Sequence, residues 1–583
     1  MGAFLYIRRP APSEQAAQDS VAQRSILQMQ SRGLQHKALL ARNGFDLHIY
    51  SKRRFETENV LEFENGSFIV ATGTLIYRNR IGNAALAALF EDFTRERLTF
   101  ENALGHFAVW IYHAGRLSLF TDYQGMYQVY RDETWGLISS SFLAVHAACK
   151  TRTPSAQEIY EYLCFSHYYG NQTIIKEVSR LDERFIHQLV PGHSETLKRI
   201  RLPEFDPQAD FDAQVERTHE LLGNYFGALA AAFGNDQSLG LTGGYDSRLT
   251  LACLRHCGVS PRVYVQGPDS SIDVRIAKAV AAAGNFKIDH EPDAAMPAFT
   301  RDEFAARLQS AYHYIDGFNP AGLFNSWSLS ANERSRVPRP ERLRLYGMAG
   351  EIYRRNLPLA NRPCTIERFL TVQADKADYS SFTDSFDKRG FFRAVGAKNV
   401  AAMQLDARRL TPEQTELSYP HFRLARNSGW QMSAQNERAH ALVPYGEPAL
   451  SYASGGIRME FRDLGRFEAA LIQRADPVLA AVTSAYGHAF SEAPGLKRRL
   501  RTSLLRAVPV AARPLMYRLR AKRRQPPDRA IFQRADYLSA IFPDGFPHVR
   551  PLVNVNEIKD AAMLSRALTV ELILDGRFAC QPA

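Results

Sequence analysis

One short turn constrains the fold of this chain more than any other feature. Residues 242–247, Thr-Gly-Gly-Tyr-Asp-Ser, follow an apolar run at 238–242 and precede a helical pattern at 248–256. A second strand pattern at 262–267 and a second helical pattern at 274–283 come next. Strands that alternate with helices in this way form a parallel sheet covered by helices. The sequence therefore predicts a parallel α/β domain in the second part of the chain.

The same turn has the chemistry of a phosphate site. Its two glycines let the backbone approach a phosphate chain, and the N–H groups and dipole at the helix start favour negative charge. Thr242 and Ser247 add hydroxyls, and Asp246 implies a Mg²⁺ ion between its carboxylate and the phosphate oxygens. A Walker lysine and the GxGxxG dinucleotide fingerprint are both absent, which weighs against kinases and hydride-transfer enzymes.

The turn resembles the SGGxDS pyrophosphate loop of the glutamine-dependent asparagine synthetase family, with threonine in the first position. Segment 347–351 is similar to that family's acidic GEGADE turn. It is one residue shorter and has Gly350 in place of an aspartate, so Glu351 is the matching acid. Further similar segments, spread over nearly the whole chain, are 263–266, 271–274 with Ala277 and Ala281, 444–448 and 564–574.

The resemblance implies ATP and Mg²⁺ as ligands and assigns roles to residues of both turns. The residues expected to be catalytic are Asp246, Ser247 and Glu351. Those expected to bind the nucleotide are Thr242, Gly243, Gly244, Asp246, Ser247 and Val265. The expected metal ligands are Asp246 and Glu351. A cationic side chain should assist as well, but the family's RxK segment has no clear match, and the candidates are Arg426, Arg458 and Lys278.

The N-terminal part has a different pattern. Short β-rich runs alternate with turns between residues 45 and 142, with helical stretches at 82–94 and 154–165, which predicts an α+β layered domain. The proline-bearing segment 196–212 is the expected linker. With the resemblance, we expect a glutaminase-like αββα sandwich of the Ntn-hydrolase type over 1–200. An ATP-pyrophosphatase domain, similar to adenine-nucleotide α-hydrolases, should follow over 201–485, and a basic helical extension with the family's final helix over 486–583.

The glutaminase-like domain should be unable to hydrolyse glutamine. In the family a cysteine after the initiator methionine is the nucleophile, and Gly2 stands at that position. The family's glutamine-holding NGE segment appears as residues 72–74, Thr-Gly-Thr, and its GD pair as Gly105 and His106. Segment 122–125, Asp-Tyr-Gln-Gly, keeps a structural feature of the family. The resemblance therefore implies that this domain has retained the glutaminase fold and lost the glutaminase reaction.

The implied activity is ATP-dependent amide formation. A carboxylate would attack the α-phosphorus of ATP, pyrophosphate would leave, and ammonia or an amine would displace AMP. The amine could belong to the same molecule, as in β-lactam synthetases and lasso-peptide cyclases, which also combine a cysteine-less glutaminase-like domain with a synthetase domain. The expected substrate is a small-molecule, peptide or glycan carboxylate.

The positive charge of the chain is concentrated in one segment. The net charge is +11, and residues 497–529 hold 12 basic residues and one acid, Asp528, so the rest of the chain is balanced. Leucines among these arginines favour an amphipathic helical pair broken by Pro509 and Pro514. An anionic membrane surface, an acidic precursor peptide and tRNA are alternative partners, a solvated extension is a fourth option, and nucleic acid is the weaker choice because the charge is local.

Other features point to a cytoplasmic enzyme. No apolar run reaches the roughly 18 residues of a membrane span, and six scattered cysteines indicate reduced thiols. We therefore expect a cytoplasmic location, with peripheral attachment to the inner membrane as an option. Two other classes stay open, an adenylating RNA-modifying enzyme and a catalytically inactive scaffold. The glutaminase-like domain weighs against the first, and the intact Gly-Gly-x-Asp-Ser turn against the second.

Overall fold

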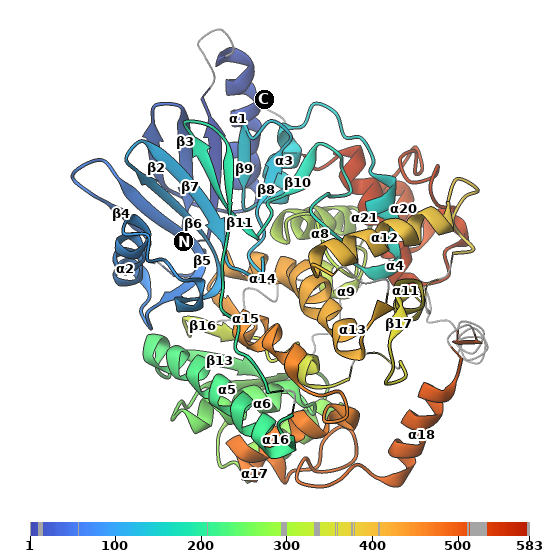
Figure 1. Cartoon of the computed structure of the whole chain (residues 1–583). Helices are drawn as coiled ribbons and strands as arrows, with labels where there is room; N and C mark the ends of the chain where they lie inside the picture. The colour runs from blue at the N-terminus through green and yellow to red at the C-terminus, as the bar shows by residue number, and fades with distance from the viewer. Residues whose placement is uncertain are drawn as a thin grey trace.

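The structure, a computed structural model, describes residues 2–9, 15–55, 58–206, 208–292, 300–330, 339–355, 357, 359–374, 377, 379–405, 409–509, 512–513 and 533–579. Two antiparallel sheets form the N-terminal part, and a parallel sheet with its helices lies below them in Figure 1. Further helices, mostly from the last 280 residues, fill the side of the molecule beside both parts (Figure 1).

The N-terminal part contains two six-stranded sheets, in which every pairing is antiparallel. The first has the order β10-β8-β9-β1-β3-β2, from β1 (Ala3–Arg8), β2 (His36–Arg42), β3 (Phe45–Tyr50), β8 (Tyr130–Asp132), β9 (Leu137–Ser139) and β10 (Val178–Arg180). The second has the order β12-β11-β7-β6-β5-β4, from β4 (Val60–Glu62), β5 (Phe68–Tyr77), β6 (Ala103–His113), β7 (Arg116–Thr121), β11 (Phe185–Val190) and β12 (Ser194–Leu197).

Strand β1 shows why the two sheets form a sandwich. Because successive side chains of a strand point to opposite faces, Phe4 and Tyr6 enter the core between the sheets, where the ring of Tyr6 stacks on Trp110 at 5.3 Å. The alternate residues of β1 face helices α1 (Gln15–Ser31) and α3 (Phe142–Ala148) on the outer side. Helix α2 (Gly82–Thr94) covers the outer face of the second sheet. The expected αββα layer order is therefore present.

A five-stranded parallel sheet follows, as the alternating pattern predicts. Its order is β15-β14-β13-β16-β19, from β13 (Gln237–Gly240), β14 (Arg262–Gln266), β15 (Ile288–Glu291), β16 (Leu343–Leu345) and β19 (His440–Leu442). The helices of this part include α5 (Phe211–Phe233), α6 (Asp246–His256), α7 (Ile272–Ala283) and α16 (Arg466–Ala475). The strand order reverses between β13 and β16, and ligands of open α/β sheets bind at the carboxyl ends of strands at such a point.

The remaining helices connect the two parts. Their bounds are α4 (Ala156–Phe165), α8 (Arg301–Tyr314), α9 (Ser326–Leu329), α11 (Ile366–Gln373), α12 (Lys388–Ala402), α13 (Pro412–Ser418), the π-helix η4 (Tyr419–Ser428), α14 (Gly429–Asn436), α15 (Pro448–Ser451), α17 (Pro477–Ala480), α18 (Leu496–Ala507), α20 (Ala535–Ile541) and α21 (Ala561–Asp575). A short pair, β17 (Cys364–Thr365) and β18 (Arg409–Leu410), lies among them.

Helix α21 is part of the N-terminal core although it comes from the end of the chain. Its apolar side chains pack with those of α3, α4 and α8 in one cluster that also includes the outer face of β1. One hydrophobic core thus crosses the boundaries expected near residues 200 and 485, and the division into 1–200, 201–485 and 486–583 stays a prediction. None of the described helices is long and apolar enough to cross a membrane.

Candidate functional site

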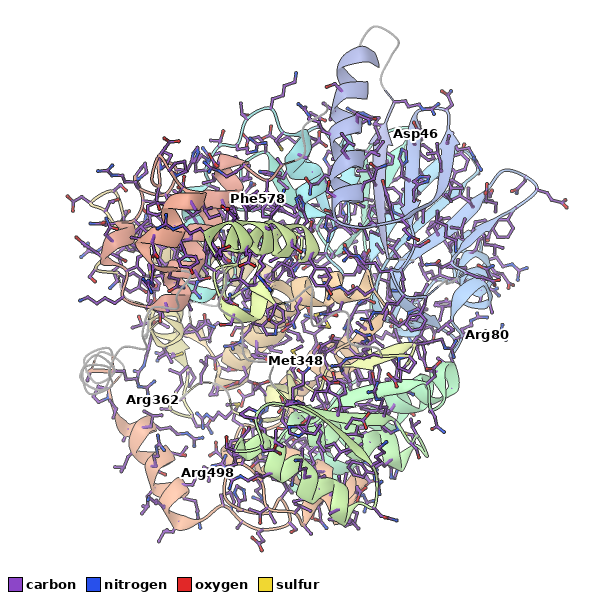
Figure 2. The ribbon with its side chains drawn as sticks, turned by 180° about the vertical axis from the view of Figure 1, so that it is seen from behind. Asp46, Arg80, Met348, Arg362, Arg498 and Phe578 are labelled. Atoms are coloured by element: carbon purple, nitrogen blue, oxygen red, sulfur yellow. The ribbon has the colours of Figure 1, made fainter. Side chains whose placement is uncertain are left out.

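The two turns singled out by the sequence meet at the carboxyl ends of β13 and β16. The glycine of the second turn, Gly347, is so close to the first that a Cβ there would lie 2.5 Å from Cα of Ser247. The backbone N–H of Gly350 donates to Oδ2 of Asp246 at 3.0 Å. Met348 of this second turn lies near the centre of the molecule in Figure 2. Residues more than 100 positions apart thus form one site at the reversal of strand order.

Hydrogen bonds within the chain shape the first turn. The backbone N–H of Thr242 donates to Oγ of Ser247 at 3.0 Å, and the two hydroxyl oxygens also lie 3.0 Å apart. The N–H of Gly243 donates to Oδ1 of Asp273, at the start of α7, at 2.8 Å. Helix α6 begins at Asp246 without a side-chain cap, so its first N–H groups remain available to an anion.

Val265 has a different environment from the other residues expected at the nucleotide. It lies on β14, and its side chain is buried in the core beneath the sheet. Thr242 is exposed, and Gly244 and Asp246 are partly exposed, so the surface of the turn can be reached from solvent. A contact between Val265 and a ligand would therefore come from its backbone.

An arginine that the sequence analysis missed lies at the centre of the site. Nη2 of Arg354 donates to Oδ1 of Asp246 at 2.5 Å and lies 3.9 Å from Oε1 of Glu351. Its Nε lies 2.6 Å from Oε2 of Glu468, a fully buried residue of α16. Arg354 follows Glu351 by three positions, which offered a weak signal, whereas nothing in the sequence placed Glu468 here.

The pKa values of two carboxyl groups in this site are raised, because burial outweighs the opposing charge of Arg354. Burial raises the pKa of Asp246 to about 6, because it outweighs the opposing effect of Arg354, and Glu351 adds to the increase. Burial also raises the pKa of Glu468 well above its ordinary value, against the effect of Arg354. The pKa of Arg354 is raised, because its carboxylate neighbours outweigh its own burial. Perturbed groups of this kind cluster at functional sites.

The carboxylates of Asp246 and Glu351 could bind a metal cation, because both are oxygen ligands and both face the same position. Asp246 and Glu351 both point an oxygen at the same nitrogen of Arg354, and carboxylate oxygens are the ligands that Mg²⁺ prefers. The guanidinium group stands at the position that these oxygens share. A metal ion at these two residues would therefore replace or displace the contact with Arg354.

The three cations expected from the sequence lie elsewhere. Arg426 pairs with Glu183 of the N-terminal part at 2.9 Å, and Lys278 pairs with Asp269 at 2.7 Å. Arg458 forms an ion pair with Glu460 on the surface. Each of the three therefore has a carboxylate partner outside the site. Arg354 is instead the cationic side chain that lies at the two turns.

A cavity of about 790 Å³ opens beside the acidic site. Tyr419 joins the two, because it lines the cavity and its hydroxyl group donates to Oε2 of Glu351 at 3.0 Å. Basic side chains outnumber acidic ones in the wall, which includes Arg355, Arg423, Arg506 and Arg566 against Glu416 and Asp560. Aromatic rings form another part of the wall, from Phe165, Tyr169, Tyr419 and Phe422. Such a lining suits an anionic ligand with an apolar portion.

Helix α18, which contains most of the described residues of the basic segment, forms one side of this region. Arg506 lines the cavity and pairs with Asp463 at 2.7 Å. Arg498, labelled in Figure 2, lies 4.5 Å from the ring centre of Tyr486, and that ring lies 4.9 Å from the ring of Tyr245 in the first turn. Three leucines on the helix, Leu496, Leu500 and Leu504, are exposed. Residues 510–511 and 514–529 of the expected basic pair lie outside the described residues.

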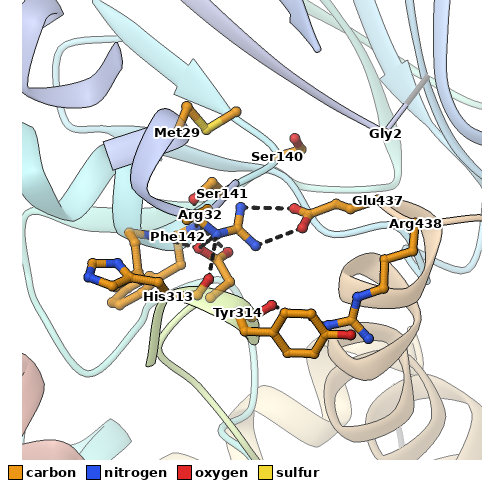
Figure 3. Close-up of polar contacts among 12 residues, drawn as sticks. Gly2, Met29, Arg32, Ser140, Ser141, Phe142, His313, Tyr314, Glu437 and Arg438 are labelled. Atoms are coloured by element: carbon orange, nitrogen blue, oxygen red, sulfur yellow. Dashed lines mark hydrogen bonds and ion pairs between the residues drawn. The ribbon is translucent and has the colours of Figure 1, made fainter. Parts of the chain in front are cut away.

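No side chain can be added at the position of the missing nucleophile without displacing backbone. A Cβ on Gly2 would lie 2.8 Å from the carbonyl oxygen of Glu437 and 2.9 Å from that of Ser51. The carboxylate of Glu437 receives two hydrogen bonds of 2.8 Å from the buried Arg32, whose Nε is 3.2 Å from Asp316 (Figure 3). Gly2 therefore packs against the C-terminal part.

The other positions expected to have held glutamine also contact the C-terminal part. Oγ1 of Thr74 donates to Oδ1 of Asn436 at 2.6 Å, and the N–H of Val443 donates to Nε2 of His106 at 3.0 Å. Burial lowers the pKa of His106 to about 3, so its ring stays neutral and can accept this bond. The N–H of Gly105 donates to Oε2 of Glu447 at 3.2 Å. Residues 436–447 thus contact both segments that the resemblance assigns to glutamine binding.

Comparisons with known proteins leave the family open. No family model and no curated protein matches the chain, whereas 24 chains of solved structures do. One is the allosteric regulatory enzyme of purine biosynthesis, with 10% identity and a TM-score of 0.23 over 51% of this chain and 82% of that one. Another is glutamine phosphoribosylpyrophosphate amidotransferase from B. subtilis complexed with ADP and GMP, with 12% identity and a TM-score of 0.22 over 50% of this chain and 65% of that one. Scores of this size do not establish a shared fold.

Proposed function

We propose that the chain is an ATP-dependent amide-forming ligase of the asparagine synthetase type that does not use glutamine. The observation that carries the proposal is the meeting of the two turns at the reversal of strand order. There the uncapped start of α6, the carboxylates of Asp246 and Glu351 and the guanidinium of Arg354 surround one accessible position. This combination suits a nucleotide whose pyrophosphate group leaves with its charge neutralised.

In the first step, a substrate carboxylate oxygen attacks the α-phosphorus of ATP and the bond to pyrophosphate breaks. The N–H groups of 244–247 and the hydroxyl groups of Thr242 and Ser247 hold the phosphate oxygens. Asp246 and Glu351 would hold a Mg²⁺ ion, which would neutralise part of the phosphate charge. Arg354, freed from part of its contact with Asp246, supplies a second positive charge to the leaving group. The residues thus position groups and balance charge rather than forming covalent bonds.

In the second step, an amine nitrogen attacks the acyl carbon, AMP leaves, and the amine gives up a proton. The packing of Gly2, Thr74, Gly105 and His106 against 436–447 supports an amine source other than glutamine hydrolysis. The source is then free ammonia, a second substrate, or an amine of the molecule that bears the carboxylate. The last case would make the chain a cyclase.

We assign the carboxylate substrate to the 790 Å³ cavity. Tyr419 and Arg355 bring its wall next to Glu351 and Arg354, so a carboxylate in the cavity could reach a nucleotide at the turns. The excess of arginine over acidic residues in the wall favours an anionic molecule, and the aromatic rings favour an apolar part. A peptide or a glycan-derived carboxylate fits this description, as does a smaller acid. Arg506 of α18 gives the basic segment a role in the same site.

Two other functions make different predictions. An adenylating RNA-modifying enzyme would use the basic segment to bind RNA. Arg498 and Arg506 contact Tyr486 and Asp463, but Lys497, Arg499 and Arg501 are exposed, so the glutaminase-like domain, rather than this segment, weighs against RNA. An inactive scaffold has no need for a partly buried Arg354 beside two carboxyl groups whose pKa burial raises. These contacts favour the ligase, and the same experiment separates all three.

The test is binding of ATP with Mg²⁺ to the purified full chain, followed by pyrophosphate release. Substrate pools would contain carboxylic acids, candidate precursor peptides and ammonium salts, with total tRNA as a separate pool. We expect pyrophosphate release that falls by roughly 10²-fold or more in Asp246→Asn and Arg354→Met, because each removes a charge at the leaving group. Arg458→Met is the matched control, since Arg458 lies on the surface.

Each outcome decides between the functions. Release that depends on a carboxylate pool and on Asp246 supports the ligase. Release that depends on tRNA supports the RNA-modifying enzyme and contradicts the ligase. A wild-type chain that binds no ATP at millimolar concentration would establish the scaffold.

A further inference from the structure

The hairpin at one edge of the second sheet brings two histidines and a glutamate together. His187 of β11 is the direct cross-strand partner of Glu195 on β12, and His193 lies in the loop that joins the strands. Nδ1 of His187 is 3.2 Å from Oε1 of Glu195, and Nε2 of His193 is 3.5 Å from the same oxygen. The three potential ligand atoms lie within 4.8 Å of one another. None of these residues has a role in the proposed ligase.

The surrounding contacts orient both rings. The other ring nitrogen of His187, Nε2, is 3.0 Å from the backbone carbonyl oxygen of Asp182. A proton on Nε2 donates to this oxygen, which leaves the lone pair on Nδ1 directed toward Glu195. Metal-binding histidines commonly have a carbonyl or carboxylate partner of this kind, which fixes the tautomer and the ring orientation.

The ligand atom of His187 is buried and lacks a hydrogen bond. Nδ1 is inaccessible to solvent, and within the described part of the chain no group forms a hydrogen bond with it. Glu195, the nearest acidic group, does not have the geometry of a hydrogen bond to this nitrogen although it is close. A buried polar atom without a partner costs free energy, and a bound ion would remove that cost.

His193 is held by a different contact. The ring of Trp135 stacks on the ring of His193 with 3.9 Å between ring centres, and it also lies 5.4 Å from the ring of His187. The exposed histidine is therefore restrained before any ligand binds.

We propose that His187, His193 and Glu195 form a binding site for a divalent transition metal of the zinc class. Two histidine nitrogens and one carboxylate oxygen are a common ligand set for zinc, and a fourth position stays open to water or to a ligand from outside the chain. The ion would tie β11 to β12 immediately before the segment that leads to the parallel sheet. It would therefore stabilise the edge of the sandwich.

The experiment is a titration of the metal-free full chain with Zn²⁺ by calorimetry and with Co²⁺ by visible absorption. We expect one ion per chain and a tetrahedral or five-coordinate Co²⁺ spectrum. His193→Gln and Glu195→Gln should each weaken binding by about 100-fold or more, since loss of even an outer contact costs roughly 10- to 100-fold. Both residues are partly exposed, so these variants should fold.

A second pair of histidines provides the matched control. His36 and His48 lie on the β2–β3 hairpin with 3.2 Å between ring nitrogens, but among the described residues no glutamate completes a metal-binding group with them. His48→Gln should leave the affinity unchanged. Zn²⁺ should also raise the unfolding temperature of the wild type and of His48→Gln, but not of Glu195→Gln.

Two results would overturn the site. One is a wild-type chain that binds neither ion at micromolar concentration. The other is an affinity for Zn²⁺ in His193→Gln and in Glu195→Gln that equals that of the wild type. Because the titration needs neither ATP nor a carboxylate substrate, its outcome is independent of the ligase.

Discussion

The Asp246 carboxyl group should reduce the stability of the protein at neutral pH. Its pKa is raised from an ordinary 3.8 to about 6, mainly by burial. The folded protein therefore holds the proton on Asp246 more tightly than the unfolded chain does. The stabilisation of the folded state by this proton is fully present below pH 3.8 and is lost as the pH rises through 6. A shift of about two units corresponds to ~3 kcal/mol of unfolding free energy.

Asp246→Asn tests this magnitude directly. Asparagine keeps the shape of the side chain and an oxygen that can accept the hydrogen bond from Gly350, but it never ionises. Above pH 6 the variant should exceed the wild type by up to ~3 kcal/mol in unfolding free energy, and the difference should vanish near pH 3.8. The measurement is urea unfolding of both proteins at closely spaced pH values. The gain in stability should accompany a loss of pyrophosphate release, as is common where function needs a destabilising buried charge.

Asp182 provides a control, because its pKa is shifted in the opposite direction. Although burial opposes it, hydrogen bonds from Arg184 lower the pKa of Asp182. Asp182→Asn should therefore be less stable than the wild type at neutral pH and should approach it in acid. The reasoning about Asp246 would be refuted if Asp246→Asn were less stable than the wild type at pH 8, or if its difference did not change with pH.

Two further predictions concern the contact between the N-terminal and C-terminal parts. Gly2→Ala should lower unfolding free energy by about 1–3 kcal/mol, because the new Cβ meets carbonyl oxygens at 2.8 and 2.9 Å, and Gly2→Cys should not produce glutamine hydrolysis. Gly192→Ala, with no atom within 4 Å of the new Cβ, is the control in both thermal unfolding and glutaminase assays. Arg32→Met should cost about 3–5 kcal/mol in urea unfolding, because it leaves Glu437 and Asp316 buried without their cation. A cost below about 1 kcal/mol would contradict a structural role for this ion pair.

Local patterns were sufficient to predict the first turn and its sheet. The alternation of apolar strands with helices from residue 238 to 283 depends on neighbours in sequence, and the sheet has that form. The expected helix at 82–94 also agrees with α2. The glycines and hydroxyls of 242–247 were recognisable because a phosphate loop needs those residue types at fixed spacing. Their assignment to a nucleotide stays a prediction.

The partners of that turn were not predictable from local patterns. Glu468 is a buried acid on the amphipathic helix α16, and it reaches Arg354 only because α16 packs beside α6. Arg426 was a candidate cation by residue type, but its ion pair with Glu183 depends on how the two parts of the chain meet. Long-range electrostatic contacts of this kind have no signal in the spacing of residues along the chain.

The sequence by itself determined a layered α+β domain, the parallel sheet and the turn that opens at Thr242, because these follow from periodicity and from backbone requirements within a few residues. Only the tertiary structure decided which charge stands among the carboxylates, that α18 borders the cavity, and that Gly2 lies against Glu437. The physical reason is distance along the chain. Burial, ion pairing and close packing depend on which surfaces meet, and here those surfaces come from segments more than 100 residues apart.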